Sequence, residues 1–180
     1  MKKNLWIALL LTSAAIAGEN AGNLRVGADF GMPYYLTVDN TKVNDRGNYN
    51  VGLDARYFTT ESFNVGGRFS YDLEDNNGFR QMSFAPGVQY HWMPQERFVP
   101  YVRADVPVIF QGAANTGAAD DKMDVGVSAG AGVAWNLGQS MGINQLSLRY
   151  DFNMGYTFGI KTALPVLNLE LAKVGLDYRF

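Results

Sequence analysis

The stretch LRVGADFGMPYYLTV, from Leu24 to Val38, alternates side-chain character at nearly every step. All of its even-numbered residues are apolar or aromatic, whereas Arg25, Gly27 and Asp29 stand among the odd-numbered ones. Successive side chains of a β-strand point to opposite faces, so a period of two predicts a strand with one apolar face. A helix would instead repeat its apolar residues about every 3.6 positions.

The same alternation returns seven more times, in 49–58, 63–73, 81–92, 98–110, 123–137, 145–158 and a last segment from near Val166 to Phe180. Compact connectors at 59–62, 93–97 and 138–144 alternate with connectors at 39–48, 74–78, 111–122 and 159–165, which include the longer and more polar or Gly/Ala-rich ones. An even number of strands with alternating connectors predicts an all-β fold: an eight-stranded antiparallel up-and-down barrel with the two sets of connectors at opposite ends.

The first residues have the three-part pattern of a secretory signal peptide. Lys2 and Lys3 precede an apolar run, Leu5 to Leu11, and small residues lead to Ala17. We therefore predict a cleaved signal peptide over residues 1–17 and a single barrel domain over residues 18–180. The apolar run is too short for a transmembrane helix, and no later stretch approaches 18 unbroken apolar residues.

Composition excludes several classes of protein. The chain has no cysteine, so it forms no disulfide and is not a lipoprotein anchored through an acylated cysteine. Removing Lys2 and Lys3 lowers the basic count from 15 to 13 against 17 acidic residues, which gives a net charge of about −4. An acidic chain is unsuited to nucleic acid.

The composition of the two strand faces decides which face meets water. A soluble barrel fills its interior with apolar side chains, and a membrane barrel reverses this arrangement. The polar face carries seven basic and seven acidic residues, a balance that favours a self-neutralising lumen: Arg25, Asp29, Asp54, Arg56, Arg68, Asp72, Arg103, Asp105, Asp124, Arg149, Asp151, Lys173, Asp177 and Arg179. Ten glycines on the same face would leave room for the arginine side chains.

Aromatic residues gather near the predicted strand ends, as the two interfacial girdles of a membrane barrel require. Tyr57, Phe58 and Phe180 would lie at one rim, and Phe110 and Tyr156 toward the other. The simpler explanation is that strands favour aromatic residues in general. Two girdles in eight strands favour the membrane barrel.

The whole predicted mature chain resembles the small outer-membrane β-barrels of Gram-negative bacteria, such as the OmpA transmembrane domain and the OmpX/Ail type. Its ending, Val174, Leu176, Tyr178 and Phe180 at alternate positions, resembles the C-terminal signal read by the barrel assembly machinery. The resemblance implies an outer-membrane location, with lipid and that machinery as partners and Phe180 at the periplasmic rim. We expect a monomer, no nucleic acid, no cofactor and a surface ligand that the sequence does not identify.

Two functions remain open for such a barrel. An eight-stranded interior is just wide enough for side chains to fill, so fourteen lumen charges should pair and plug it, leaving a porin-like scaffold that displays surface loops. The alternative is a narrow channel for small solutes or apolar compounds, with Leu167, Leu169, Leu171 and Ile109 forming an apolar mouth. A β-bulge near Ala172 and Lys173 would instead return those leucines to lipid.

A lipid-modifying enzyme is a further hypothesis, which the sequence disfavours. Such chemistry needs a base beside a nucleophile. His91 is the only histidine, and Ser83 lies roughly 27 Å away along the same predicted strand. No catalytic residue is therefore predicted. Asp120, Asp121 and Asp124 could hold calcium weakly, but a solvated acidic loop is the simpler interpretation and no metal site is predicted.

Overall fold

The computed structural model describes residues 22–39, 42–47, 49–73, 79–113, 122–137, 145–158 and 166–180. Ten strand segments account for nearly all of these residues: β1 (Leu24–Asp39), β2 (Lys42–Gly47), β3 (Asn50–Phe58), β4 (Phe63–Asp72), β5 (Phe79–His91), β6 (Phe98–Asp105), β7 (Val108–Ala113), β8 (Lys122–Asn136), β9 (Leu146–Phe158) and β10 (Val166–Arg179). The predicted signal peptide, 1–17, lies outside the described residues.

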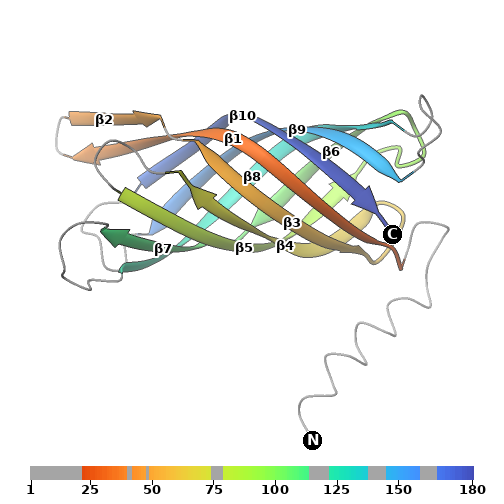
Figure 1. Ribbon diagram of the computed structural model, residues 1–180, viewed down its shortest axis with the longest axis horizontal. Helices are drawn as coiled ribbons and strands as arrows, with labels where there is room; N and C mark the ends of the chain where they lie inside the picture. Colours follow the sequence, from red (N-terminus) through yellow and green to blue (C-terminus); the bar gives the residue numbers. More distant parts are fainter. Residues whose placement is uncertain are drawn as a thin grey trace, which may run out of the picture.

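The strands form one closed antiparallel barrel (Figure 1). All pairs of adjacent strands are antiparallel, and β10 closes the ring by pairing with β1 from Arg25 opposite Arg179 to Thr37 opposite Val166. The ten segments make eight barrel strands because β2 and β3 continue one another along β1, as β6 and β7 do along β8. The predicted eight-stranded barrel is confirmed.

One end of the barrel carries the start of β1, the carboxyl terminus, the connectors at 59–62 and 93–97, and the strand ends at Asn136 and Leu146; we call it the termini end. The opposite end, at the left of Figure 1, is the loop end, where β1, β4, β7 and β9 finish and β2, β5, β8 and β10 begin. One predicted connector, 39–48, is wrong, because β1 runs to Asp39 and β2 pairs with it over Lys42–Gly47. The sequence does not reveal this hairpin, because the second strand, KVNDRG, is mostly polar and has no apolar alternation.

The two faces of the barrel have opposite character. Large apolar side chains point outward, among them Leu53, Phe84 and Leu176, while most buried side chains are polar or charged and face the lumen. An apolar belt around a polar interior is the arrangement of a membrane barrel. No helix among the described residues is long and apolar enough to cross a membrane.

A β-bulge interrupts β10 and decides the direction of its leucines. From Glu170 to Lys173, β10 advances three residues while each of its partner strands, β1 and β9, advances only two. Glu170 and Lys173 are consequently both buried in the lumen, and Leu171 points outward. The bulge alternative is therefore correct, and Leu171 does not contribute to an apolar mouth.

Phe58 departs from its predicted place in the aromatic girdle. It is fully buried inside the termini end, where its ring lies 4.9 Å from the Arg179 guanidinium carbon and 5.5 Å from the His91 ring. The strand register explains this, because Phe58 continues the inward series of Asp54 and Arg56. By contrast, Phe180 is 68% exposed on the outer surface.

Candidate functional site: the barrel lumen

The structure gathers the predicted lumen charges inside the barrel. Thirteen of the fourteen are buried, and Arg179 is half-buried at the termini end. Asp72 and Asp124 are buried near the loop end. Glu170 adds an eighth acidic side chain that sequence reasoning missed. The lumen of the described barrel is therefore a nearly neutral assembly of buried charges.

Arg149 on β9 stands at the centre of this assembly. Its guanidinium lies 3.1 Å from Asp29, 3.4 Å from Asp54 and 3.0 Å from Asp151. Asp177 on β10 is also within 3.7 Å. The Tyr101 hydroxyl donates to the other oxygen of Asp151, so one aromatic side chain joins the network from β6. Arginine suits this role because its planar guanidinium presents five donors to several carboxylates at once.

Further arginines close the central layer across the lumen. Arg56 donates from Nε to Asp54, at 2.9 Å, and from Nη2 to Asp105, at 3.0 Å. Arg103 reaches the second oxygen of Asp105 at 3.1 Å. Arg25 pairs with Asp54 at 3.2 Å. Charged side chains from β1, β3, β6, β9 and β10 thus form one connected network of ion pairs across the lumen.

A second cluster lies toward the loop end, around Arg68 and Glu170. Arg68 makes a bidentate pair with Asp29 and approaches Glu170 at 3.4 Å. Glu170 also accepts hydrogen bonds from Lys173 Nζ at 2.8 Å and from Asn153 Nδ2 at 2.6 Å. Asp29 connects the two clusters, since it pairs with both Arg68 and Arg149. Such sharing offsets the large desolvation cost of buried ions.

Glycine on the lumen face gives these side chains their space. A Cβ atom placed on Gly52 would lie 2.6 Å from an Asp29 oxygen and 2.7 Å from Arg68 Nε. A Cβ on Gly132 would lie 2.5 Å from the Tyr101 hydroxyl. At these two positions, the charged and tyrosine side chains of the network occupy the space that a larger residue would need, as predicted for the lumen glycines.

An aromatic and apolar layer lies between the charges and the termini end. Tyr101, Val99 and Ala134 form a buried cluster, and the His91 ring lies 5.3 Å from that of Tyr101 and packs against Phe58. Sequence reasoning missed this layer because it assigned aromatic side chains to lipid. The signal was available in the register, since Val99 and Tyr101 share the inward phase of Arg103 and Asp105.

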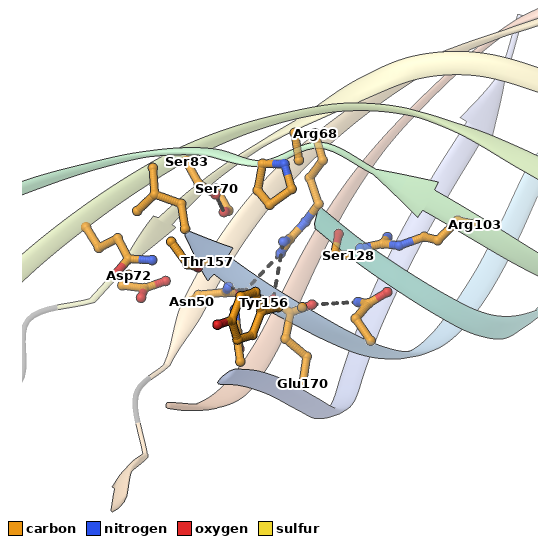
Figure 2. Close-up of a pocket in the computed structure, with 17 residues that line it drawn as sticks. Asn50, Arg68, Ser70, Asp72, Ser83, Arg103, Ser128, Tyr156, Thr157 and Glu170 are labelled. Carbon is orange, nitrogen blue, oxygen red and sulfur yellow. Dashed lines mark hydrogen bonds and ion pairs between the residues drawn. The ribbon is translucent and has the colours of Figure 1, made fainter. Parts of the chain in front are cut away.

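The loop end of the lumen is hollow. A small cavity of about 50 Å³ opens to solvent here and is lined by side chains from β3 to β10. Figure 2 shows Arg68, Arg103 and Glu170 in its wall, with Ser70, Ser83, Ser128 and Thr157 around them. Ile109 lines it as well, as predicted. The cavity lies on the loop side of the central ion-pair layer.

His91 has no catalytic surroundings within the described part of the chain. Its Nε2 lies 2.9 Å from the amide nitrogen of Asn64, whose N–H₂ donates to the ring. Ser83 is engaged elsewhere, with its hydroxyl 2.5 Å from that of Ser70. No group of three or more potential metal ligands occurs among the described residues. Asp120 and Asp121 of the considered calcium loop lie outside the described residues.

The predicted assembly signal forms an outward stripe at the end of β10. Val174, Leu176, Tyr178 and Phe180 are all exposed on the outer surface. The Tyr178 and Phe180 rings form an edge-to-face pair with centroids 4.8 Å apart. The Phe180 N–H donates to the Leu24 carbonyl oxygen, with an N···O distance of 2.8 Å. Recognition of this stripe by assembly machinery stays a prediction.

Comparisons with solved structures give the same barrel. Neisserial surface protein A, from Neisseria, is similar at 15% identity over 88% of this chain and 99% of that chain, with a TM-score of 0.71. The N-terminal β-barrel domain of Pseudomonas aeruginosa OprF is 12% identical over 89% and 98%, with a TM-score of 0.61. Ail, the attachment invasion locus protein of Yersinia pestis, is 14% identical over 89% and 99%, with a TM-score of 0.56.

A comparison with curated protein sequences gave no match. The family model described as outer membrane protein beta-barrel domain matches residues 5–180, which is nearly the whole chain. The predicted family resemblance and outer-membrane location are confirmed. The chain belongs to the outer membrane protein beta-barrel domain family and is a small eight-stranded barrel of the outer membrane.

Proposed function

We propose that this protein is a structural scaffold that holds its loop-end connectors at the cell surface while its lumen stays closed to bulk diffusion. The observation that carries the proposal is the buried ion-pair network, in which Arg149 alone approaches four carboxylates. An open polar pore would keep such charges hydrated, whereas buried ions need partners. The aromatic layer around Tyr101 and Phe58 adds a second obstruction.

The position of the connectors supports the proposed surface display. Segments 40–41, 74–78, 114–121 and 159–165 all join strands at the loop end, opposite the carboxyl terminus. The structural neighbour Ail is described as an attachment invasion locus protein, which supports an interaction role for the loop end of this barrel. The proposed partners are outer-membrane lipid, the assembly machinery and a surface ligand of unassigned chemistry, with the barrel acting as a monomer.

The experiment places one epitope tag in segment 114–121 and, as a matched control, the same tag in the termini-end connector 93–97. Antibody labelling of intact cells should detect the first tag and not the second. Both tags should be detected after the outer membrane is opened. Labelling of the 93–97 tag on intact cells, with none at 114–121, would refute the proposed orientation.

A narrow channel for small solutes is the competing function, and the loop-end cavity is the observation that favours it. The cavity supplies an entrance, but the central layer around Arg149 and Asp54 lies across the route to the termini end. Passage would require that layer to open. Electrical conductance separates the two functions.

A further inference from the structure

The outer wall of the barrel has a groove at the seam where β10 closes the ring against β1, two strands that run side by side in Figure 1. Gly27 and Asp177 pair across the seam and line the groove, and the Asp177 side chain is buried in the lumen, so the groove reaches down to the backbone. Its volume is about 200 Å³, and its other lining side chains come from four adjacent strands: Val26, Ala28, Leu53, Leu146, Leu176 and Tyr178.

The small side chain of Ala28 accounts for the depth of the groove. Ala28 lies opposite Leu53 on β3 and opposite Leu176 on β10, so a single methyl group stands between two leucine side chains on the outer face. Leu53 is 61% exposed and Leu176 is 49% exposed, and both therefore rise above it as walls. Toward the termini end the groove continues between Val26 and Tyr178, which also pair across the seam.

The groove ends at a polar edge near the termini end. The Tyr178 hydroxyl donates to Oε1 of Gln145 at 3.1 Å, and both side chains are exposed. The Gln145 amide nitrogen carries two further donors. Tyrosine is enriched at the membrane interface, where its ring meets the acyl chains and its hydroxyl reaches the headgroups. The groove therefore runs from the middle of the wall, at Leu53, to the depth of the lipid headgroups.

The size and surroundings of the groove fit one acyl chain. A water molecule occupies about 30 Å³ in the liquid and a methylene group is of similar size, so there is room for about six or seven methylenes. The groove opens onto the apolar belt of an outer-membrane barrel, which acyl chains surround. Lipid tails are as apolar as leucine, so van der Waals contact decides what fills it. A flexible chain can follow a narrow groove, whereas a second barrel would bring one convex wall against another.

We propose that the groove over the β1–β10 seam holds one acyl chain of a membrane phospholipid, with the headgroup at Tyr178 and Gln145. The Gln145 amide donates to an ester or phosphate oxygen, and the chain covers the backbone of the strands that close the ring. The phospholipid is thereby retained as a fixed constituent of the barrel. This inference rests on the proposed function in one respect, the partnership with outer-membrane lipid, and does not depend on the closed lumen.

The test is native mass spectrometry of the refolded barrel in detergent, titrated with palmitoyl-oleoyl phosphatidylethanolamine, with heat-modifiable mobility as the folding control. The wild type should retain one phospholipid per barrel. Ala28→Leu fills the groove with protein and should weaken this binding at least about fivefold. The matched control Ala129→Leu makes the same change on the exposed outer face of β8, away from the groove, and should change binding less than about twofold.

A second variant decides the matter if Ala28→Leu does not fold. Leu53→Ala lowers one wall without filling the groove and should weaken phospholipid binding about two- to fivefold. Glycerophosphoethanolamine, which carries the headgroup without acyl chains, should not bind.

Four results would each overturn the proposal: no phospholipid retained by the folded wild type, equal binding of the chain-free headgroup, equal effects of Ala28→Leu and Ala129→Leu, or a barrel dimer that Ala28→Leu disrupts. Conductance is a separate readout. A closed barrel that retains no phospholipid refutes the groove site alone, whereas a steady current refutes the closed lumen alone.

Discussion

Replacing Arg149 with methionine should destabilise the barrel more than any exposed arginine replacement. Methionine fills much of the same volume, so the effect is mainly electrostatic. With Arg179 included, the described lumen side chains comprise seven basic and eight acidic ones, and the variant leaves six against eight. Four carboxylates lose a partner that lies between 3.0 and 3.7 Å away. Removing one member of a buried pair costs about 3–5 kcal/mol, and we expect a loss of about 4 kcal/mol in the free energy of unfolding.

The double variant Arg149→Met with Asp151→Asn tests the electrostatic origin of this loss. It leaves six basic and seven acidic side chains and so restores the original excess of one acid. Asparagine also keeps an acceptor for the Tyr101 hydroxyl. The double variant should therefore recover at least about 1 kcal/mol relative to Arg149→Met alone.

The measurement is equilibrium unfolding in urea, followed by the fluorescence of Trp92 and Trp135 and by heat-modifiable gel mobility. Arg97→Met removes an exposed arginine and its contacts with the Phe98 and Trp135 rings; as the control it should change stability by less than about 1 kcal/mol, read from Trp92 and gel mobility. A loss below about 1 kcal/mol for Arg149→Met, or no recovery in the double variant, would refute the tightly paired lumen.

Three further substitutions test other parts of the barrel. Gly52→Ala places a Cβ atom 2.6 Å from a carboxylate oxygen and 2.7 Å from a guanidinium nitrogen, so urea unfolding should show a loss of about 1–3 kcal/mol in the free energy of unfolding. The control Gly155→Ala, whose nearest contact is 3.2 Å, should show a smaller loss. Equal losses would contradict the crowding argument. Leu53→Lys puts a charge on the lipid-facing middle of β3 and should lower the free energy of unfolding in a bilayer by about 2–4 kcal/mol. The control Met93→Lys at the rim should lower it by only about 0–1 kcal/mol. Equal losses at the two positions would argue against the membrane orientation. Deleting Phe180 should reduce the folded barrel in cell outer membranes, measured by heat-modifiable mobility, with refolding of the purified protein largely retained; normal amounts in cells would contradict its role in assembly.

Alternation in the sequence is enough to predict the barrel and most of its lumen. In strands such as Asn50–Phe58, side chains alternate strictly between the lumen and the outer surface, so an odd or even residue number tells which way each side chain points. Thirteen predicted lumen charges are buried for this reason. Tyr101 and Phe58 follow the same parity, and they were missed only because residue type was given more weight than register.

Two features were harder to predict. The bulge in β10 shifts parity within one strand, and its signal is Glu170, a charge that strict alternation would place in lipid. The ion pairs themselves depend on how strands are staggered around the ring. Arg68 and Glu170 are 102 residues apart in the chain, and only closure of the barrel brings them together. The sequence shows which charges face the lumen without showing which of them meet.

Single-channel conductance in a planar bilayer tests the closed lumen most directly, with heat-modifiable mobility as the folding control. The wild-type barrel should stay closed or flicker rarely, and Arg103→Ala and Arg149→Ala, which each remove a network partner, should raise the conductance. A steady wild-type current that neither substitution changes would contradict the account, because the lumen charges would then be hydrated in a pore that is already open.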